Sequence, residues 1–244
     1  NNHMVQNADL TIAKQFFASY KNALHQAVHD GNYALPNQII NELNTYQETY
    51  GKAVMPSETK LSAEIFLNNL KVFSRLAFFN FFLGLLFLGL MFFNVFKPNV
   101  NITKIQKTLT LFFVVSLVFH GVGLALRWYV SGRAPWSNGY ESMIYIAFTS
   151  ALAGFIFARK SLGATAATLV LSGTVLLIAL LSYLDPEITP LVPVLNSYWL
   201  TIHVSLEAGS YGFLLLGGII GFINLVLIGI AQEKSKNRIL GMVK

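Results

Sequence analysis

Cysteine is absent from this chain of 244 residues, and charged residues are scarce. The lack of cysteine excludes disulfides, thiolate metal sites and covalent cofactor attachment through a Cys-x-x-Cys-His motif of its own. Any cofactor would therefore be held non-covalently. Charged residues make up 11% of the chain, against about 25% in soluble domains. With 54% hydrophobic residues and a mean hydropathy of +0.55, the composition indicates an integral membrane protein.

Several functional signatures are missing as well. The sequence has no Gly-rich phosphate loop ending in Lys-Ser/Thr, no His-Glu-x-x-His and no Ser or Cys nucleophile context. Few acids and bases lie within the apolar stretches, which argues against a proton-coupled carrier. Nothing predicts a nucleic-acid partner. The chain has neither an initiator methionine at residue 1 nor a secretory n-region, so we expect an internal piece of a longer protein.

Five long runs lack charge, and each is close to the roughly 20 residues that cross a bilayer. In lipid the backbone must satisfy its own hydrogen bonds, so these runs predict helices. The expected fold is an all-α, polytopic helical membrane protein with a small N-terminal helical segment outside the membrane. We expect a segment 1–70 and a membrane domain 71–244. The predicted spans are 76–96, 108–130, 141–158, 162–184 and 199–231.

Residues 1–70 differ from the rest because their apolar residues recur at helical spacing, as in Ile12, Phe16, Tyr20 and Leu24. Asp30-Gly31 predicts a break between two amphipathic helices. His25 and His29 lie one turn apart there, a pair that lacks a third metal ligand and fits a solvated helix face.

Lysine and arginine predict the orientation, because cytoplasmic loops carry an excess of both. One set of connections holds nine of these residues: Lys97, Lys104, Lys107, Arg159, Lys160, Lys234, Lys236, Arg238 and Lys244. The other set holds four: Lys71, Arg75, Arg127 and Arg133. We therefore expect residues 1–74 and the loops near 131–140 and 185–199 to be extracytoplasmic.

His203 is the first candidate for chemistry, near the outer start of the last span. Trp199 and Glu207 lie four residues on either side, so all three share one helix face. The imidazole offers a lone pair to a metal, and a carboxylate one turn away can orient the ring. The spacing alone favours an interfacial histidine bound to headgroups and water over a metal ligand.

A second candidate is the short loop that carries Arg127, Arg133 and Trp136. Guanidinium groups suit carboxylates such as haem propionates, and they also suit lipid phosphates. His120, in the middle of the second span, is a third candidate. It fits a bond to a neighbouring helix best, although a proton relay or a metal ligand is also open.

Two stretches, RWYVSGRAPWSNGYESM and NSYWLTIHVSLEAGSYGFLLLG, occur in this order and are separated by two predicted spans. Together they resemble the CcsA (ResC) part of system II cytochrome c synthases, as found in CcsBA fusion proteins. The resemblance covers roughly residues 50–244, and residues 1–70 look like the end of the CcsB (ResB) extracytoplasmic part.

The resemblance implies cytochrome c biogenesis in the bacterial inner membrane: export of haem and its ligation to the Cys-x-x-Cys-His motif of apocytochrome c at the outer face, a haem lyase activity. It implies non-covalent haem b, with His203 as an axial ligand to the iron. Trp199, Arg127, Arg133 and Trp136 would lie around the haem, with His120 and Glu207 as weaker candidates. A CcsB/ResB-like part of the same or a partner chain would complete the system.

This chain departs from the family pattern at two points. The Trp-rich motif W-G-x-x-W-x-W-D is missing, so another part of the protein or a partner would complete the haem site, and this stretch alone would be inactive. Glu207 stands where the family pattern has an apolar residue. The alternatives are a transporter or permease subunit without a bound cofactor, in which His120 would matter, and a structural membrane anchor.

Overall fold

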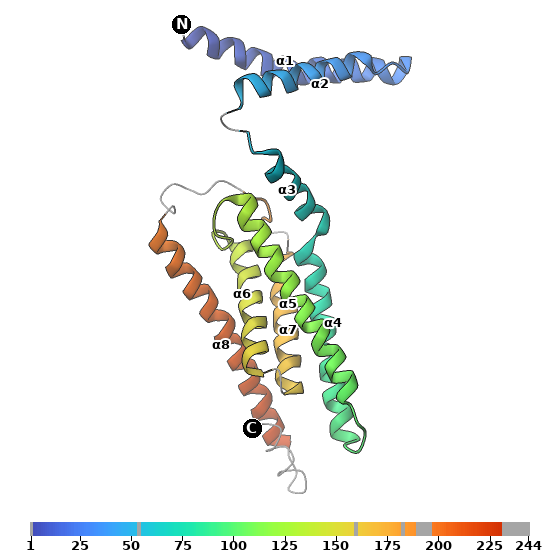
Figure 1. Ribbon diagram of the computed structural model, residues 1–244, viewed down its shortest axis with the longest axis vertical. Helices are drawn as coiled ribbons and strands as arrows, with labels where there is room; N and C mark the ends of the chain where they lie inside the picture. Colours follow the sequence, from blue (N-terminus) through green and yellow to red (C-terminus); the bar gives the residue numbers. More distant parts are fainter. Residues whose placement is uncertain (1, 53–54, 159–160, 182–183, 189–196, 231–244) are drawn as a thin grey trace. The chain divides into compact units, whose positions relative to one another are not determined.

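The computed structural model describes residues 2–52, 55–158, 161–181, 184–188 and 197–230, and it contains only helices and connecting turns in those ranges. The chain divides into two compact units, Asn1–Ser57 and Glu58–Lys244. Figure 1 shows both. The predicted all-α class is confirmed.

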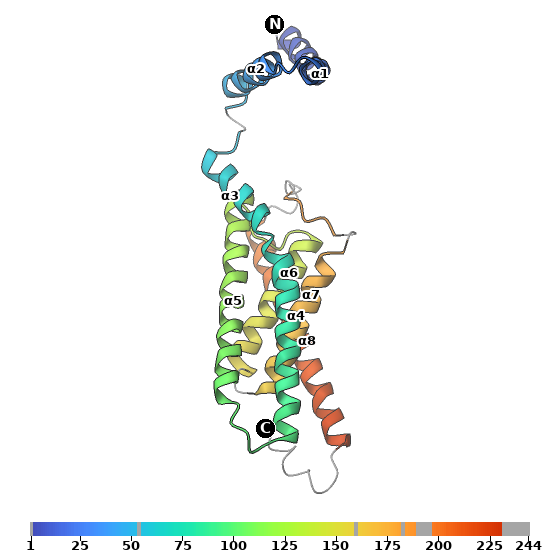
Figure 2. The same ribbon diagram turned by 90° about the vertical axis from the view of Figure 1, so that its right-hand side faces the viewer.

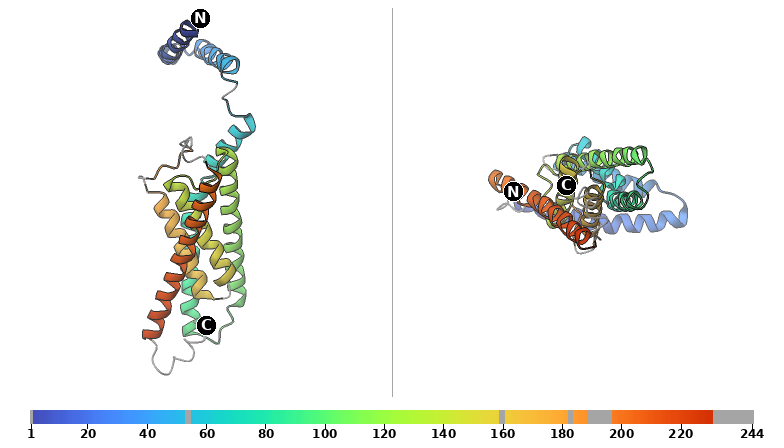
Figure 3. Two further views of the ribbon diagram at one scale, coloured as in Figure 1. Left: turned by 90° about the vertical axis from the view of Figure 1, so that its left-hand side faces the viewer. Right: turned by 90° about the horizontal axis from the view of Figure 1, so that it is seen from below.

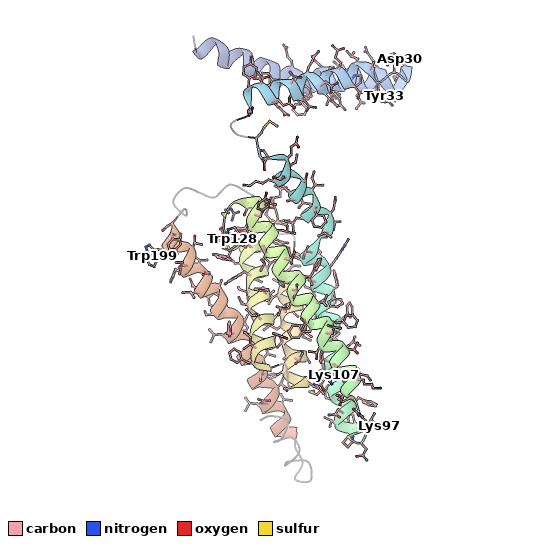
Figure 4. The ribbon with its side chains drawn as sticks, viewed as in Figure 1. Asp30, Tyr33, Lys97, Lys107, Trp128 and Trp199 are labelled. Atoms are coloured by element: carbon pink, nitrogen blue, oxygen red, sulfur yellow. The ribbon has the colours of Figure 1, made fainter. Side chains whose placement is uncertain are left out.

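The first unit is a helical hairpin. Helix α1 (Asn2–Asp30) and helix α2 (Ala34–Tyr50) are joined by a tight turn, at which Asp30 and Tyr33 are labelled in Figure 4. Gly31 takes a left-handed φ of 68° there, a conformation that glycine adopts without steric cost. The break lies where the sequence predicts it.

The second unit is a helical bundle that begins at Glu58, so it includes a helix that the sequence pattern assigned to the segment 1–70. Within the described ranges, five helical stretches are long and apolar enough to cross a membrane, which confirms a multi-pass membrane protein. Its elements are α3 (Glu58–Leu70), α4 (Val72–Phe96), α5 (Thr103–Ser131), α6 (Gly139–Ala153) with the π-helical turn η1 (Gly154–Ala158), α7 (Leu162–Ala179) and α8 (Tyr198–Ile230).

The fourth predicted span and helix α7 have different ends. The prediction runs to residue 184, whereas α7 stops at Ala179, followed by a C-cap at Leu180. The amide of Leu180 bonds back to the carbonyls of Leu176 and Leu177, which tightens the last turn. Further along the chain, the Pro186 carbonyl accepts from Arg127 of α5 at 2.9 Å.

Helices α4 and α7 form the most extensive helix contact of the bundle (Figure 2). Glycine makes this close approach possible, because a Cβ atom at Gly173 would lie 2.5 Å from the amide nitrogen of Phe81, and one at Gly84 would lie 2.7 Å from that of Val170. A polar network supports the same region: the Ser116 hydroxyl donates to Asn80 at 2.8 Å, and the Asn80 amide donates to Ser172 at 3.3 Å.

Helix α8 lies along one side of the bundle (Figure 3) and packs mainly on α6. Gly212 permits this contact, since a Cβ there would lie 2.5 Å from the Thr149 hydroxyl. The buried face of α8 carries small side chains such as Ala208, which is 6% exposed. Only 17% of its membrane-spanning window is buried, so most of the surface of α8 is not covered by the described helices.

Candidate functional site

The two ends of the second unit differ in side-chain chemistry. Trp128 and Trp199 lie at one end, and Lys97 and Lys107 lie at the other (Figure 4). We call the first the aromatic end. Tryptophan favours membrane–water interfaces. The sequence-predicted site residues other than His120 belong to the last turns of α5, the loop after it and the first three turns of α8.

The centre of the aromatic end is a buried ion cluster of Arg127, Glu141 and Arg133, which we call the Arg–Glu–Arg cluster. The Arg127 Nε lies 3.0 Å from Glu141 Oε1, and the Arg133 Nη1 lies 2.7 Å from Glu141 Oε2. The exposed side-chain fractions are 5%, 13% and 0% for Arg127, Arg133 and Glu141. Charges buried to this degree are stable only when they are paired.

Local sequence builds this cluster. Helix α5 ends at Ser131, and its C-cap is Gly132, whose left-handed φ of 69° favours glycine and whose amide donates to the Trp128 carbonyl. The side chain of Asn138 then caps α6 by accepting from the amide of Glu141 at 2.7 Å. Glu141 is thereby fixed at the third position of α6, and its Oε2 also accepts from the Ser137 amide at 2.9 Å.

The Arg127 guanidinium also reaches a second loop. Its Nη2 donates to the carbonyls of Pro186 and Glu187 at 2.9 and 3.4 Å, and its Cζ lies 5.2 Å from the centre of the Tyr140 ring. One buried cation thus joins the end of α5, the start of α6 and the segment after α7. We expected Arg127 to face a bound carboxylate; that role stays a prediction, and the structure places Glu141 and the loop carbonyls against it.

Trp136 connects the cluster's loop to α8. Its indole Nε1 donates to the Thr201 carbonyl at 3.2 Å, and its ring packs on Tyr145 and Trp128 with centroids 4.7 and 5.6 Å apart. The start of α8 is therefore held beside the Arg–Glu–Arg cluster by a tryptophan.

His203, Glu207 and Tyr211 form a polar ladder along successive turns of α8. The His203 Nε2 lies 3.7 Å from Glu207 Oε2, and the Tyr211 hydroxyl donates to Glu207 Oε1 at 2.9 Å. The side chains of His203 and Glu207 are 75% and 50% exposed. Trp199, one turn before His203, is 77% exposed.

The predicted site residues therefore fall into two groups. Trp136 joins Arg127 and Arg133 beside Glu141, whereas Trp199, His203 and Glu207 share the exposed side of α8. His203 follows Thr201 by two positions, a rotation of about 200° around the helix, so the imidazole points away from the surface that Trp136 contacts. The indole bond at Thr201 is thus the described link between the groups.

His120 lies apart from both groups, in the membrane core of α5. It is 1% exposed, its Nε2 lies 3.0 Å from the Ile144 carbonyl of α6, and Phe73 and Phe148 pack edge-on against it. Its Nδ1 has no hydrogen-bond partner. Within the described ranges no group of three metal-ligating side chains occurs. These contacts suit the helix-packing interpretation.

Glu141 is the residue whose importance reasoning from the sequence missed. Two signals in the sequence point to it: the Asn138-x-x-Glu141 spacing of a helix N-cap, and the two arginines that precede it, Arg127 and Arg133, in a stretch that has few other charges.

Residues 136–242 match the family described as Cytochrome C assembly protein. Over 190 residues the chain is 41% identical to protein NrfI of Wolinella succinogenes, covering 78% of this chain and 21% of NrfI. It is 34% identical over 131 residues to the cytochrome c biogenesis protein CcsA of Prochlorococcus marinus strain NATL2A, covering 52% of this chain and 42% of that protein. CcsA of Chlorella vulgaris is 39% identical over 109 residues, 43% of this chain and 34% of the relative. The chain thus spans a fifth of NrfI and less than half of these CcsA proteins.

Proposed function

Since this chain belongs to the CcsA-type family of cytochrome c assembly proteins, we propose that it presents haem b to apocytochrome c at the outer face of the bacterial inner membrane. In this proposal haem is the substrate, and His203 binds its iron as an axial ligand. The aromatic end faces outward, as the distribution of lysine and arginine predicts.

The observation that carries the proposal is the accessible imidazole of His203 at the aromatic end of α8. Neutral imidazole is a strong ligand for haem iron, and axial ligands set the iron's potential. The exposed indole of Trp199 one turn earlier offers a flat apolar surface beside it. A polar ladder on a membrane helix is costly unless it serves a site, so the exposed side of α8 suits a haem-binding wall that other parts of the protein or a partner complete.

The chain's own residues do not supply the thiols. The haem vinyl groups would form thioethers with the two cysteines of the apocytochrome motif, because this sequence contains no cysteine. What this chain contributes is a ligand, a flat wall and a rigid frame. The Arg–Glu–Arg cluster and the Trp136 bond to Thr201 fix the start of α8, and with it His203, relative to α5 and α6.

No observation among the described residues favours the permease alternative. That alternative depends on His120, whose contacts with Ile144, Phe73 and Phe148 suit a residue that ties α5 to α6.

Cytochrome c maturation in cells tests the proposal. The protein is expressed at its natural length in a strain without its own maturation system, and holocytochrome c is measured by haem staining. We expect His203→Ala to lower the yield at least roughly tenfold. Replacing a residue that only hydrogen-bonds a metal ligand already lowers metal affinity or activity about 10–100-fold, and loss of the ligand itself should cost no less. His25→Ala, on exposed α1, is the matched control and should leave the yield unchanged. Equal yields from the two variants would remove His203 from the reaction.

The predicted orientation has a separate test. Because this sequence has no cysteine, single cysteines can report sidedness through an impermeant maleimide. We expect Asp185→Cys, near the aromatic end, to react in intact cells, and Asn99→Cys, between α4 and α5, to react only after permeabilisation. The reverse pattern would place His203 on the cytoplasmic side and contradict the proposed function.

A further inference from the structure

We propose that Glu207, anchored by Tyr211, is a positioning residue that orients the His203 imidazole and makes the iron bound to it harder to reduce. This inference rests on the proposed function, because it concerns how His203 acts as a ligand. It starts from the polar ladder of α8, in which a carboxylate stands between an imidazole and a phenol on three successive turns.

The two oxygens of the Glu207 carboxylate have different partners in the polar ladder. Tyr211 is a neutral donor and holds one carboxylate oxygen, Oε1, at 2.9 Å. The other oxygen, Oε2, is left facing His203, 3.7 Å from its Nε2. Both side chains are exposed, so a rotamer change in either one can shorten this distance to that of a hydrogen bond. Tyr211 thus points the carboxylate toward the turn that carries His203.

A carboxylate next to an imidazole fixes which ring nitrogen carries the proton. The nitrogen that faces the carboxylate keeps its hydrogen, and the opposite nitrogen presents its lone pair. In the structure the ring edge that carries Nε2 faces Glu207. A half-turn of the ring about χ2 brings the edge that carries Nδ1 to that side and turns Nε2 to the opposite side, so Nδ1 can face Glu207 while Nε2 faces the metal. Metal-binding histidines commonly donate their second N–H to a carboxylate, which orients the ring and makes it a more basic ligand.

A more basic axial ligand favours the oxidised iron. Removing the carboxylate should therefore shift the preference toward the reduced state. The ladder also explains why a carboxylate is kept on a membrane helix, where an isolated acid is costly.

The test is a redox titration of the haem-loaded protein at its natural length, at one pH and with absorbance as the readout. We expect Glu207→Gln to lower, about tenfold, the ratio of the protein's affinity for oxidised haem to its affinity for reduced haem. For a one-electron couple this raises the midpoint potential by about 59 mV. Tyr211→Phe should give a smaller shift in the same direction, because the carboxylate is less firmly held. Ser210→Ala is the matched control: its exposed hydroxyl bonds the Glu207 backbone carbonyl, and its potential should equal that of the wild type.

The outcomes separate the two proposals. If His203→Ala loses the haem spectrum while Glu207→Gln keeps the wild-type potential, the positioning role of Glu207 is wrong and the proposed function stands. A downward shift in Glu207→Gln also contradicts the inference. If His203→Ala keeps both spectrum and potential, the proposed function fails, and this inference fails with it.

Discussion

Replacing Glu141 with glutamine is expected to destabilise the second unit by about 3–5 kcal/mol, the cost typical of removing one partner from a buried ion pair. The carboxylate is fully buried and is bound by two arginines and the Ser137 amide. Glutamine has nearly the same shape, so the effect isolates the charge. For a protein of this size the loss should lower the melting temperature by roughly 10 °C, measured by thermal unfolding in detergent.

Glu187→Gln is the matched control for this prediction. It removes the same charge from the neighbouring loop, where the side chain is exposed and only the backbone carbonyl faces Arg127. Its melting temperature should stay within about 2 °C of the wild type, because an exposed charge contributes little. If Glu141→Gln were equally mild, the Arg–Glu–Arg cluster would not hold the aromatic end together.

The cluster also marks where reasoning from the sequence alone stops. The five spans are predictable because a charge inside lipid is so costly that uncharged runs delimit the helices. The ion pairs of Glu141 cannot be predicted in this way, because they depend on the turn between α5 and α6. Gly132 and Asn138 together shape that turn. Two arginines that looked available for a ligand are bound to a carboxylate of the same chain.

The face of α8 is another property that the sequence leaves open. Apolar residues occur on all sides of this helix, so helical periodicity does not separate the buried side from the exposed one. Gly212 and Ala208 determine which face of α8 is buried, because their small size lets α6 approach closely. That approach turns His203 outward, together with its neighbours Trp199 and Glu207.

The end of α7 is a further feature that the sequence alone does not predict. Its apolar run continues to residue 184, yet the helix ends at Ala179. A few residues further on, the carbonyls of Pro186 and Glu187 accept from Arg127 of α5. Composition cannot encode such a contact.

The second large effect is expected at His203 itself. His203→Gly deletes the imidazole and leaves space on an exposed helix surface. Haem retained by the purified protein, read from its Soret band, should fall at least roughly tenfold. Glycine also weakens a helix by about 1 kcal/mol, so His203→Ala, which keeps helix propensity, separates loss of the ligand from loss of structure.

Chemical rescue tests the role of His203 as an iron ligand most directly. Free imidazole added to the His203→Gly protein at its natural length should restore haem binding and the wild-type Soret position, because it replaces the missing ligand without altering the helix. Imidazole added to the wild type should change neither. If the His203→Gly protein keeps the wild-type haem content and spectrum before any imidazole is added, His203 does not bind the iron and the proposed function is wrong.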